Sequence, residues 1–283
     1  MRTCFVALAL IAARAAAAID VIDDRGVQVH LDRHASRIVT LAPNLAEIAF
    51  AAGAGASMVG VSSFTDFPPH AALLPVVGSN GRTNLEALLR LRPNLVLAWL
   101  SGNRGADLER IERLGIPLIV TEAATLADIP RLLRMVGHVA GTQIAAERSA
   151  REFETRLALR SHPIGQRLRV FYEIWHTPIM TVNGRHVISE MLSRCGAENI
   201  HSDSPLFAGS VSLEQVYARN PDAILVAGNP QEGQLAAWRA RTGLRAVRDG
   251  RVAAVDPATL HRTGPRVLSG LELLCSRIDG FWR

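Results

Sequence analysis

The sequence contains no lysine, and all 31 of its basic residues are arginine. This absence excludes reactions that need a lysine, such as Schiff-base chemistry, pyridoxal-dependent catalysis and P-loop ATP hydrolysis. Three cysteines are too few for a disulfide-rich scaffold. The arginines are spread among 26 acidic residues without a basic block that alternates with aromatics. No nucleic-acid partner is therefore expected. An apolar share of 48% excludes a disordered chain.

Residues 1–18 have the layout of a secretory signal peptide. A short basic start precedes an apolar run at 4–13, and three alanines at 16–18 supply an A-x-A cleavage signal. The apolar run is too short for a transmembrane helix. A buried N-terminal helix is the alternative interpretation. We expect cleavage and a soluble product in the periplasm.

Cleavage would leave two cysteines, Cys195 and Cys275. Two thiols in an oxidising compartment favour one disulfide. Two separate buried thiols are the alternative.

Short β-branched runs alternate with helical patterns in the first part of the chain. We expect strands at 37–41, 57–61, 95–99 and 116–120, and helices at 44–52, 85–91 and 106–114. Asn44 and Glu47 have the spacing of a capping pair at the start of the first helix. The alternation predicts a parallel α/β lobe over residues 19–126.

The strands stop in residues 127–161, where a half-polar helix is expected at 143–159 as a stiff connector. A second α/β lobe follows over residues 162–283. It is expected to contain strands at 169–174, 223–227 and 252–255, and helices at 187–195, 213–219, 233–241 and 265–278. The predicted fold is α/β: two Rossmann-like lobes with parallel sheets, joined by a long rigid helix, with a ligand cleft between them.

The two lobes share an internal repeat. Residues 84–98 align with residues 212–226, so that Leu85 matches Leu213, Glu86 matches Glu214 and Pro93 matches Pro221. Each copy reads as a capped helix, a proline-containing turn and a buried strand.

Motifs of catalysis are missing from the sequence. It has no G-x-S-x-G, no H-E-x-x-H and no C-x-x-C. Gly53 and Gly55 follow a helix instead of a strand, so they do not form a dinucleotide loop. The nine histidines show no short-range metal pattern. We therefore predict no enzyme, no catalytic residue and no metal ligand.

Several stretches resemble the cobalamin (vitamin B12) group of periplasmic substrate-binding proteins that serve ABC importers. The longest begins Arg-Ile-Val-Thr-Leu-Ala-Pro-Asn-Leu-Ala-Glu at residue 37, and another is Arg-Thr-Gly-Pro-Arg at 262–266. Further matching stretches lie at 59–69, 84–86, 97–99, 195–200 and 211–216. The resemblance runs from about residue 37 to residue 280.

The resemblance implies a monomeric receptor that captures cobalamin as a transported ligand, without a cofactor, and delivers it to a permease. Glu86 and Glu214 match docking glutamates that meet a two-fold symmetric permease in the inner membrane. The alternative is that both acids only stabilise the first turn of a helix. The resemblance also implies the Cys195–Cys275 disulfide.

The resemblance implies ligand contacts as well. The candidate ligand-binding residues are Phe64, Asp66, Phe67, Trp99, Trp175, His261 and Arg262. Phe64 stands where the family has a tyrosine, and His261 where it has an acid. Asn80 and Ala208 stand where the family has tryptophans. Each aromatic could instead pack in the core. His176 or His261 could ligate a metal ion, although a surface or hydrogen-bonding role is the commoner one for a lone histidine.

Two alternative functions remain open from the sequence. A haem or ferric-siderophore receptor could use the same scaffold, and it would favour arginines that converge on anionic groups or a histidine on iron. A periplasmic α/β enzyme would need a catalytic constellation that the motifs do not show.

Overall fold

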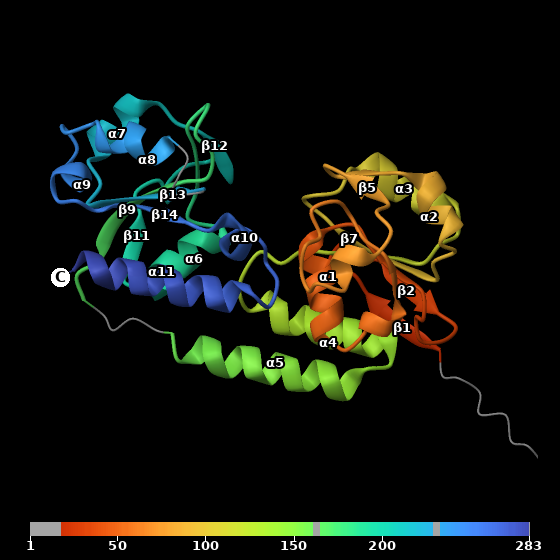
Figure 1. Cartoon of the computed structure of the whole chain (residues 1–283). Coiled ribbons are helices and arrows are strands. Elements are labelled where there is room, and N and C mark those ends of the chain that lie inside the picture. The colour runs from red at the N-terminus through yellow and green to blue at the C-terminus, as the bar shows by residue number, and fades with distance from the viewer. Residues whose placement is uncertain (1–17, 161–164, 229–232, 283) are drawn as a thin grey trace, which may run out of the picture.

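The computed structural model describes residues 18–160, 165–228 and 233–282. Two α/β lobes are joined by a pair of helices, and one of these helices runs beneath both lobes (Figure 1). This arrangement confirms the predicted fold class. The predicted signal peptide and the predicted boundary at residues 161 and 162 fall outside the described residues, except for Ala18. The domain boundaries therefore stay a prediction.

The N-terminal lobe is built on a parallel sheet in which all four strands are largely buried. Its strand order is β4-β3-β7-β8, with bounds Met58–Gly60, Ile38–Thr40, Leu95–Trp99 and Leu118–Thr121. Its helices are α1 Pro43–Ala51, α2 Leu85–Arg90 and α3 Gly105–Arg113. Two short 3-10 helices cover Gly55–Ser57 and Ala71–Leu73. One hairpin pairs β1 Ile19–Ile22 with β2 Gln28–Leu31. A second hairpin pairs β5 Gly78–Ser79 with β6 Arg82–Thr83. All four predicted strands are present.

The C-terminal lobe repeats this plan with additions. Its parallel sheet has the order β11-β9-β13-β14, with bounds Ala197–Asn199, Leu168–Glu173, Ala223–Ala227 and Val252–Val255. Its helices are α6 Val187–Arg194, α7 Leu213–Arg219, α8 Gln234–Arg239, α9 Arg245–Arg248, α10 Pro257–Leu260 and α11 Val267–Phe281. A hairpin pairs β10 Met180–Val182 with β12 Ala208–Ser210. The sequence patterns predicted neither β11 nor this hairpin.

The internal repeat extends to the backbone of the two turns. Arg92 after α2 and Asn220 after α7 are equivalent in the repeat, and both adopt left-handed conformations, with φ of 44° and 41°. In each lobe an arginine donates to the carbonyls of this turn: Arg37 directly precedes β3, and Arg169 is the second residue of β9. Arg37 bonds Arg92 O at 3.1 Å, and Arg169 bonds Asn220 O at 3.3 Å. The same contacts therefore tie each repeated helix to its sheet.

The connector consists of two helices where the sequence predicted one. Helix α4 spans Asp128–Ala140, and α5 spans Gln143–Ala158. Gly141, with φ of 73°, ends α4 and turns the chain back. A Cβ on Gly137 would lie 2.2 Å from the Ala146 side chain, so the two helices pack closely. Arg134 on α4 also bonds Glu147 at 2.7 Å and Glu154 at 2.6 Å on α5.

Helix α5 touches both lobes. At its N-terminus the N-cap Thr142 donates to Ala52 O at 2.7 Å, and further along the helix Ser149 donates to Ala51 O at 2.7 Å, both at the end of α1. At the other end of α5, Arg156 pairs with Glu272 on α11 at 3.2 Å. A helix anchored at both ends in this way is a stiff connector, as predicted. Among the described residues, no helix combines the length and the apolar composition that crossing a membrane requires.

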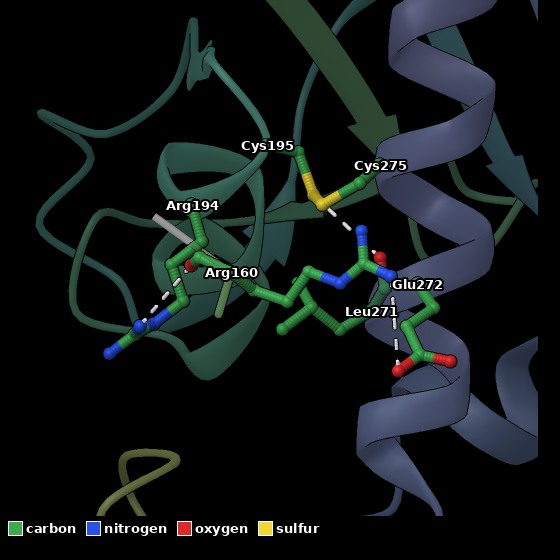
Figure 2. The surroundings of a disulfide bond; sticks show 6 residues. All are labelled: Arg160, Arg194, Cys195, Leu271, Glu272 and Cys275. Atoms are coloured by element: carbon green, nitrogen blue, oxygen red, sulfur yellow. Dashed lines mark hydrogen bonds and ion pairs between the residues drawn. A yellow bond between two sulfur atoms is a disulfide. The ribbon is translucent and has the colours of Figure 1, made fainter. Parts of the chain in front are cut away.

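The disulfide between Cys195 and Cys275 is confirmed. It joins the end of α6 to α11, with Cα atoms 4.6 Å apart (Figure 2). Both cysteines are buried, and the bond closes a sequence separation of 80 residues. Cross-linking a loop of this length removes conformational entropy from the unfolded chain.

We expect the double variant C195A/C275A to lose about 4 kcal/mol of unfolding free energy, because the unfolded chain regains the freedom of the loop. Urea unfolding of the mature protein measures this loss. Reduction of the disulfide in the wild type should also lower the free energy of unfolding. An unchanged unfolding midpoint in both experiments would contradict the expectation.

Candidate functional site

The two lobes meet through loops at the carboxyl ends of their sheets. The N-terminal lobe contributes helix α1 and the loop after β4. The C-terminal lobe contributes the loop between α10 and α11. In parallel α/β folds the carboxyl ends of the strands are where ligands usually bind. The bridge therefore marks the candidate site.

Asn44 and Glu47 take part in this bridge and do not cap a helix. Helix α1 begins at Pro43, and its N-cap Ala42 has no side-chain cap, so both residues lie inside the helix. Asn44 donates to the Thr263 hydroxyl at 3.3 Å. Arg266 donates to a Glu47 carboxylate oxygen at 2.6 Å. The predicted capping pair is wrong, because Pro43 at the first helical position shifts the start of the helix toward the N-terminus.

Glu47 is only 3% exposed, although it carries a carboxylate. Burial raises its pKa, and the hydrogen bond and charge of Arg266 oppose that rise. Gly264 allows the loop at 262–266 to pass close to Glu47, since a Cβ on this residue would lie only 2.9 Å from Glu47 Oε2. The loop that carries Arg266 thus lies directly over the buried acid.

Asp66, a predicted ligand residue, completes the cluster. It forms an ion pair with Arg262, and Arg266 lies 3.4 Å away. Partial burial acts to raise the pKa of Asp66, but the hydrogen bond and charge of Arg262 outweigh it, and the pKa lies below its ordinary value. The Arg266 guanidinium also stacks 4.3 Å from the centre of the Phe67 ring. Three of the predicted ligand residues, Asp66, Phe67 and Arg262, are therefore brought together.

Phe64 and Trp99 lie on the N-terminal side. Both line a pocket of about 140 Å³, together with residues of the β5–β6 hairpin. Phe64 is 69% exposed and has a left-handed φ of 63°. Trp99 ends β7 and packs on Gly102, and its indole N–H donates to Glu122 at 2.8 Å. The role of Glu122 could not be read from the sequence.

A larger cavity, of about 630 Å³, lies between β14, α10 and α11 of the C-terminal lobe. None of the predicted ligand residues lines it. Size alone would therefore have pointed away from the place where the lobes meet.

On the C-terminal side, Trp175 and His261 follow the carboxyl ends of β9 and β14. Trp175 is 62% exposed, and its indole N–H donates to Thr177 O at 2.9 Å. His261 Nε2 lies 3.1 Å from the hydroxyl of the buried Tyr172. Burial lowers the pKa of His261 to about 4, so the ring is neutral at physiological pH.

His186 and His176 occupy two different environments. His186 caps α6 and lies 4.8 Å from the Phe207 ring, and burial lowers its pKa to about 4. His176 Nδ1 lies 2.9 Å from the buried Glu173 carboxylate. Burial raises the pKa of Glu173, and the hydrogen bonds from His176 and Trp238 oppose the rise. Over the described ranges, no three histidine, cysteine, aspartate or glutamate side chains gather as metal ligands.

Glu86 and Glu214 occupy equivalent positions on α2 and α7, and both are exposed. Other residues cap the two helices: Asn84 accepts from Ala87 N at 3.0 Å, and Ser212 and Gln215 form a capping box. Glu214 also accepts hydrogen bonds from its own backbone N–H and from Ser212, which lower its pKa. Glu86 pairs with Arg90 at 2.9 Å on the surface.

Comparison with known proteins identifies the family. Residues 38–259 match the model of the periplasmic binding protein family. The chain belongs to this family of binding proteins.

Two curated relatives cover both lobes. The vitamin B12-binding protein of Pectobacterium carotovorum subsp. carotovorum is 37% identical over 86% of this chain and 88% of its own. That of Vibrio cholerae is 35% identical over 86% of this chain and 88% of its own.

Solved structures agree on the fold. The periplasmic vitamin B12-binding protein BtuF of Vibrio cholerae has a TM-score of 0.80 at 32% identity, covering 88% of this chain and 98% of its own. The periplasmic heme-binding protein RhuT of Roseiflexus sp. RS-1 has a TM-score of 0.78 at 26% identity, covering 88% of this chain and 99% of its own.

We expect stability to fall between pH 6.5 and 4, in part because of His261. The unfolded imidazole takes up a proton near pH 6.5 and the folded one only near pH 4. The contribution is complete above pH 6.5 and is lost as the pH falls through that window, at up to about 1.4 kcal/mol per pH unit. In H261Q the slope of unfolding free energy against pH should be shallower by that amount.

Urea unfolding at several pH values measures this slope. The variant H70Q is the control, because His70 is an exposed imidazole in the N-terminal lobe. An identical slope in H261Q and the wild type would contradict the assignment.

Proposed function

We propose that this protein binds cobalamin or a related corrinoid in the periplasm and delivers it to an ABC importer. The observation that carries the proposal is the similarity to proteins named vitamin B12-binding protein, which spans both lobes at up to 37% identity. A ligand that is held between two lobes contacts residues of both. Similarity that covers both lobes therefore bears on the ligand as well as on the fold.

The candidate residues suit a large apolar disc with amides on its rim. Phe64 and Phe67 on one side, and Trp175 on the other, are exposed aromatics that can cover the faces of a macrocycle. Asp66 and Arg262 supply an acceptor and a donor for rim amides. Neutral His261 adds a further polar group. Phe64 stands where the family has a tyrosine in contact with the ligand, so this chain lacks a hydroxyl at that position.

Binding in this receptor would involve only small movements of the lobes. Helix α5 is anchored in both lobes, and the Glu47–Arg266 pair links them next to the site. A site that is largely formed before the ligand arrives loses little free energy to ordering. The same rigidity suits a carrier that makes and breaks no covalent bond.

A haem receptor is the second candidate function. It is favoured by the likeness to the heme-binding protein RhuT, which is 26% identical with a TM-score of 0.78. The arginines of the site could attract the carboxylates of haem.

Glu86 and Glu214 would dock the protein to its permease. They stand on equivalent helices of the two lobes and are exposed, while Asn84 and Ser212 are the N-cap residues of these helices. Two equivalent acids are complementary to a basic, two-fold symmetric surface. Secretion by the signal peptide at residues 1–18 would place the protein where such a permease opens.

We expect the variants F64A and W175A each to weaken binding of cyanocobalamin by about tenfold or more, because each removes an aromatic face worth about 1–3 kcal/mol. Calorimetric titration of the mature protein measures the loss. W282A removes an exposed tryptophan near the C-terminus and should leave the affinity as it is. Equal affinities for all four proteins would contradict the placement of the ligand, and no binding by the wild type would contradict the function.

We expect the double variant E86R/E214R to abolish stimulation of the transporter's ATPase in proteoliposomes, because both docking charges are reversed. Its affinity for cyanocobalamin should match that of the wild type. The control E109R/E198R reverses one exposed acid on each lobe outside α2 and α7. Full stimulation by E86R/E214R would exclude a docking role.

A further inference from the structure

The charges of the two arginines beside the site are already balanced by carboxylates. Arg262 is paired with Asp66, and Arg266 is paired with Glu47 at 2.6 Å and lies 3.4 Å from Asp66. Both carboxylates belong to the N-terminal lobe and both arginines to the C-terminal lobe. Two positive and two negative groups therefore face each other across the lobes.

Two groups near this cluster, His261 and Asp256, add no positive charge to it. His261, directly before Arg262, is neutral at physiological pH. Asp256, which caps α10, lies near enough for its charge to act on both His261 and Arg266. An incoming carboxylate would thus meet arginines that are occupied and acids that repel it.

Of the two acids, Asp66 is the one a ligand could meet. Its side chain is 56% exposed, whereas that of Glu47 is 2% exposed and enclosed by Arg266 and Gly264. Glu47 bonds Arg266 and also lies 4.0 Å from Arg262, whereas Asp66 is the exposed acid that pairs with Arg262. An anion could use Arg262 only by displacing Asp66 or by lying beside it, and both cost free energy.

We propose that Asp66 is a specificity-determining residue that keeps anionic tetrapyrroles out of the site by occupying Arg262. The inference rests on the proposed function, and it adds the class of ligand that is rejected. Haem carries two carboxylates, whereas the rim of a corrinoid carries amides. Discrimination between ligands of similar shape often needs such a repulsive element in addition to attractive contacts.

The test is the ratio of two affinities in the variant D66N. The amide keeps the size of the side chain and an oxygen that accepts from Arg262, but it removes the charge. We expect D66N to bind haemin about tenfold more tightly than the wild type, while its affinity for dicyanocobinamide does not increase. A tenfold gain corresponds to about 1.4 kcal/mol, a reasonable value for one unpaired charge near a carboxylate in a partly wet site.

Three controls isolate the charge of Arg262. The variant D203N removes an exposed aspartate that pairs with Arg219 at 2.9 Å, within the C-terminal lobe, and should leave haemin binding as in the wild type. The dimethyl ester of haemin should gain nothing from D66N, since it has no carboxylates. The gain for haemin should also shrink when the ionic strength rises from about 0.05 M to about 0.5 M.

The double variant D66N/R262Q shows which cation the haemin uses. We expect it to lose the gain seen in D66N, because the unmasked guanidinium is gone. A gain that persists would assign the attraction to another cation, such as Arg82 at the N-terminal pocket, and would overturn the proposal.

The outcomes separate this proposal from the proposed function. If the wild-type protein binds haemin as tightly as corrinoids, Asp66 does not exclude anionic tetrapyrroles and the proposal is overturned. The proposal is also overturned if D66N has the haemin affinity and the melting temperature of the wild type. Wild-type protein that binds no corrinoid contradicts the function itself. If D66N folds poorly, D66S removes the same charge with a smaller side chain and is judged by the same ratio.

Discussion

The ion pair between Glu47 and Arg266 holds the C-terminal loop against α1 at the candidate site. A carboxylate as buried as Glu47 is costly unless a cation compensates it, and Arg266 is that cation. The partners come from different lobes and lie 219 residues apart in sequence, so satisfying Glu47 requires the C-terminal loop to lie over α1. Removing one partner of such a pair costs about 3–5 kcal/mol, because the other stays buried and uncompensated. Arg262, four residues before Arg266 on the same loop, lies within 4.0 Å of Glu47 as well.

A second set of contacts also holds the lobes together. Helix α5 is bonded to the end of α1 through Ser149 and to α11 through Arg156. Glu190 on α6 accepts from Leu126 N at 2.9 Å, just before α4. The two lobes are therefore tied to each other at several separate points.

Local sequence patterns predicted those helices and strands whose signals lie within their own segment of the chain. The repeat between residues 84–98 and 212–226 predicted two equivalent helices and strands, because each copy carries its own cap, turn and buried run. Contacts between residues far apart in the sequence could not be predicted from local patterns. Asn44 and Glu47 have the spacing of a capping pair. Their actual partners, Thr263 and Arg266, lie in the other lobe. The strands β10, β11 and β12 have three residues each, too few for a readable alternation. The predicted ligand residues came from a family resemblance, and the structure gathers only some of them in one cluster.

The absence of lysine gains a structural meaning at Arg266. Its guanidinium bonds Glu47, lies 3.4 Å from Asp66 and stacks on Phe67 at the same time. A planar fork with five N–H donors can do this, whereas the ammonium of lysine is a compact charge that is more strongly hydrated and stacks less well. A lysine there could neutralise Glu47, but it would leave the aromatic ring and the second carboxylate less firmly held. The arginine-only composition needs no functional cause, yet at this position the chemistry of arginine is what allows one side chain to join two lobes and shape the wall of a site.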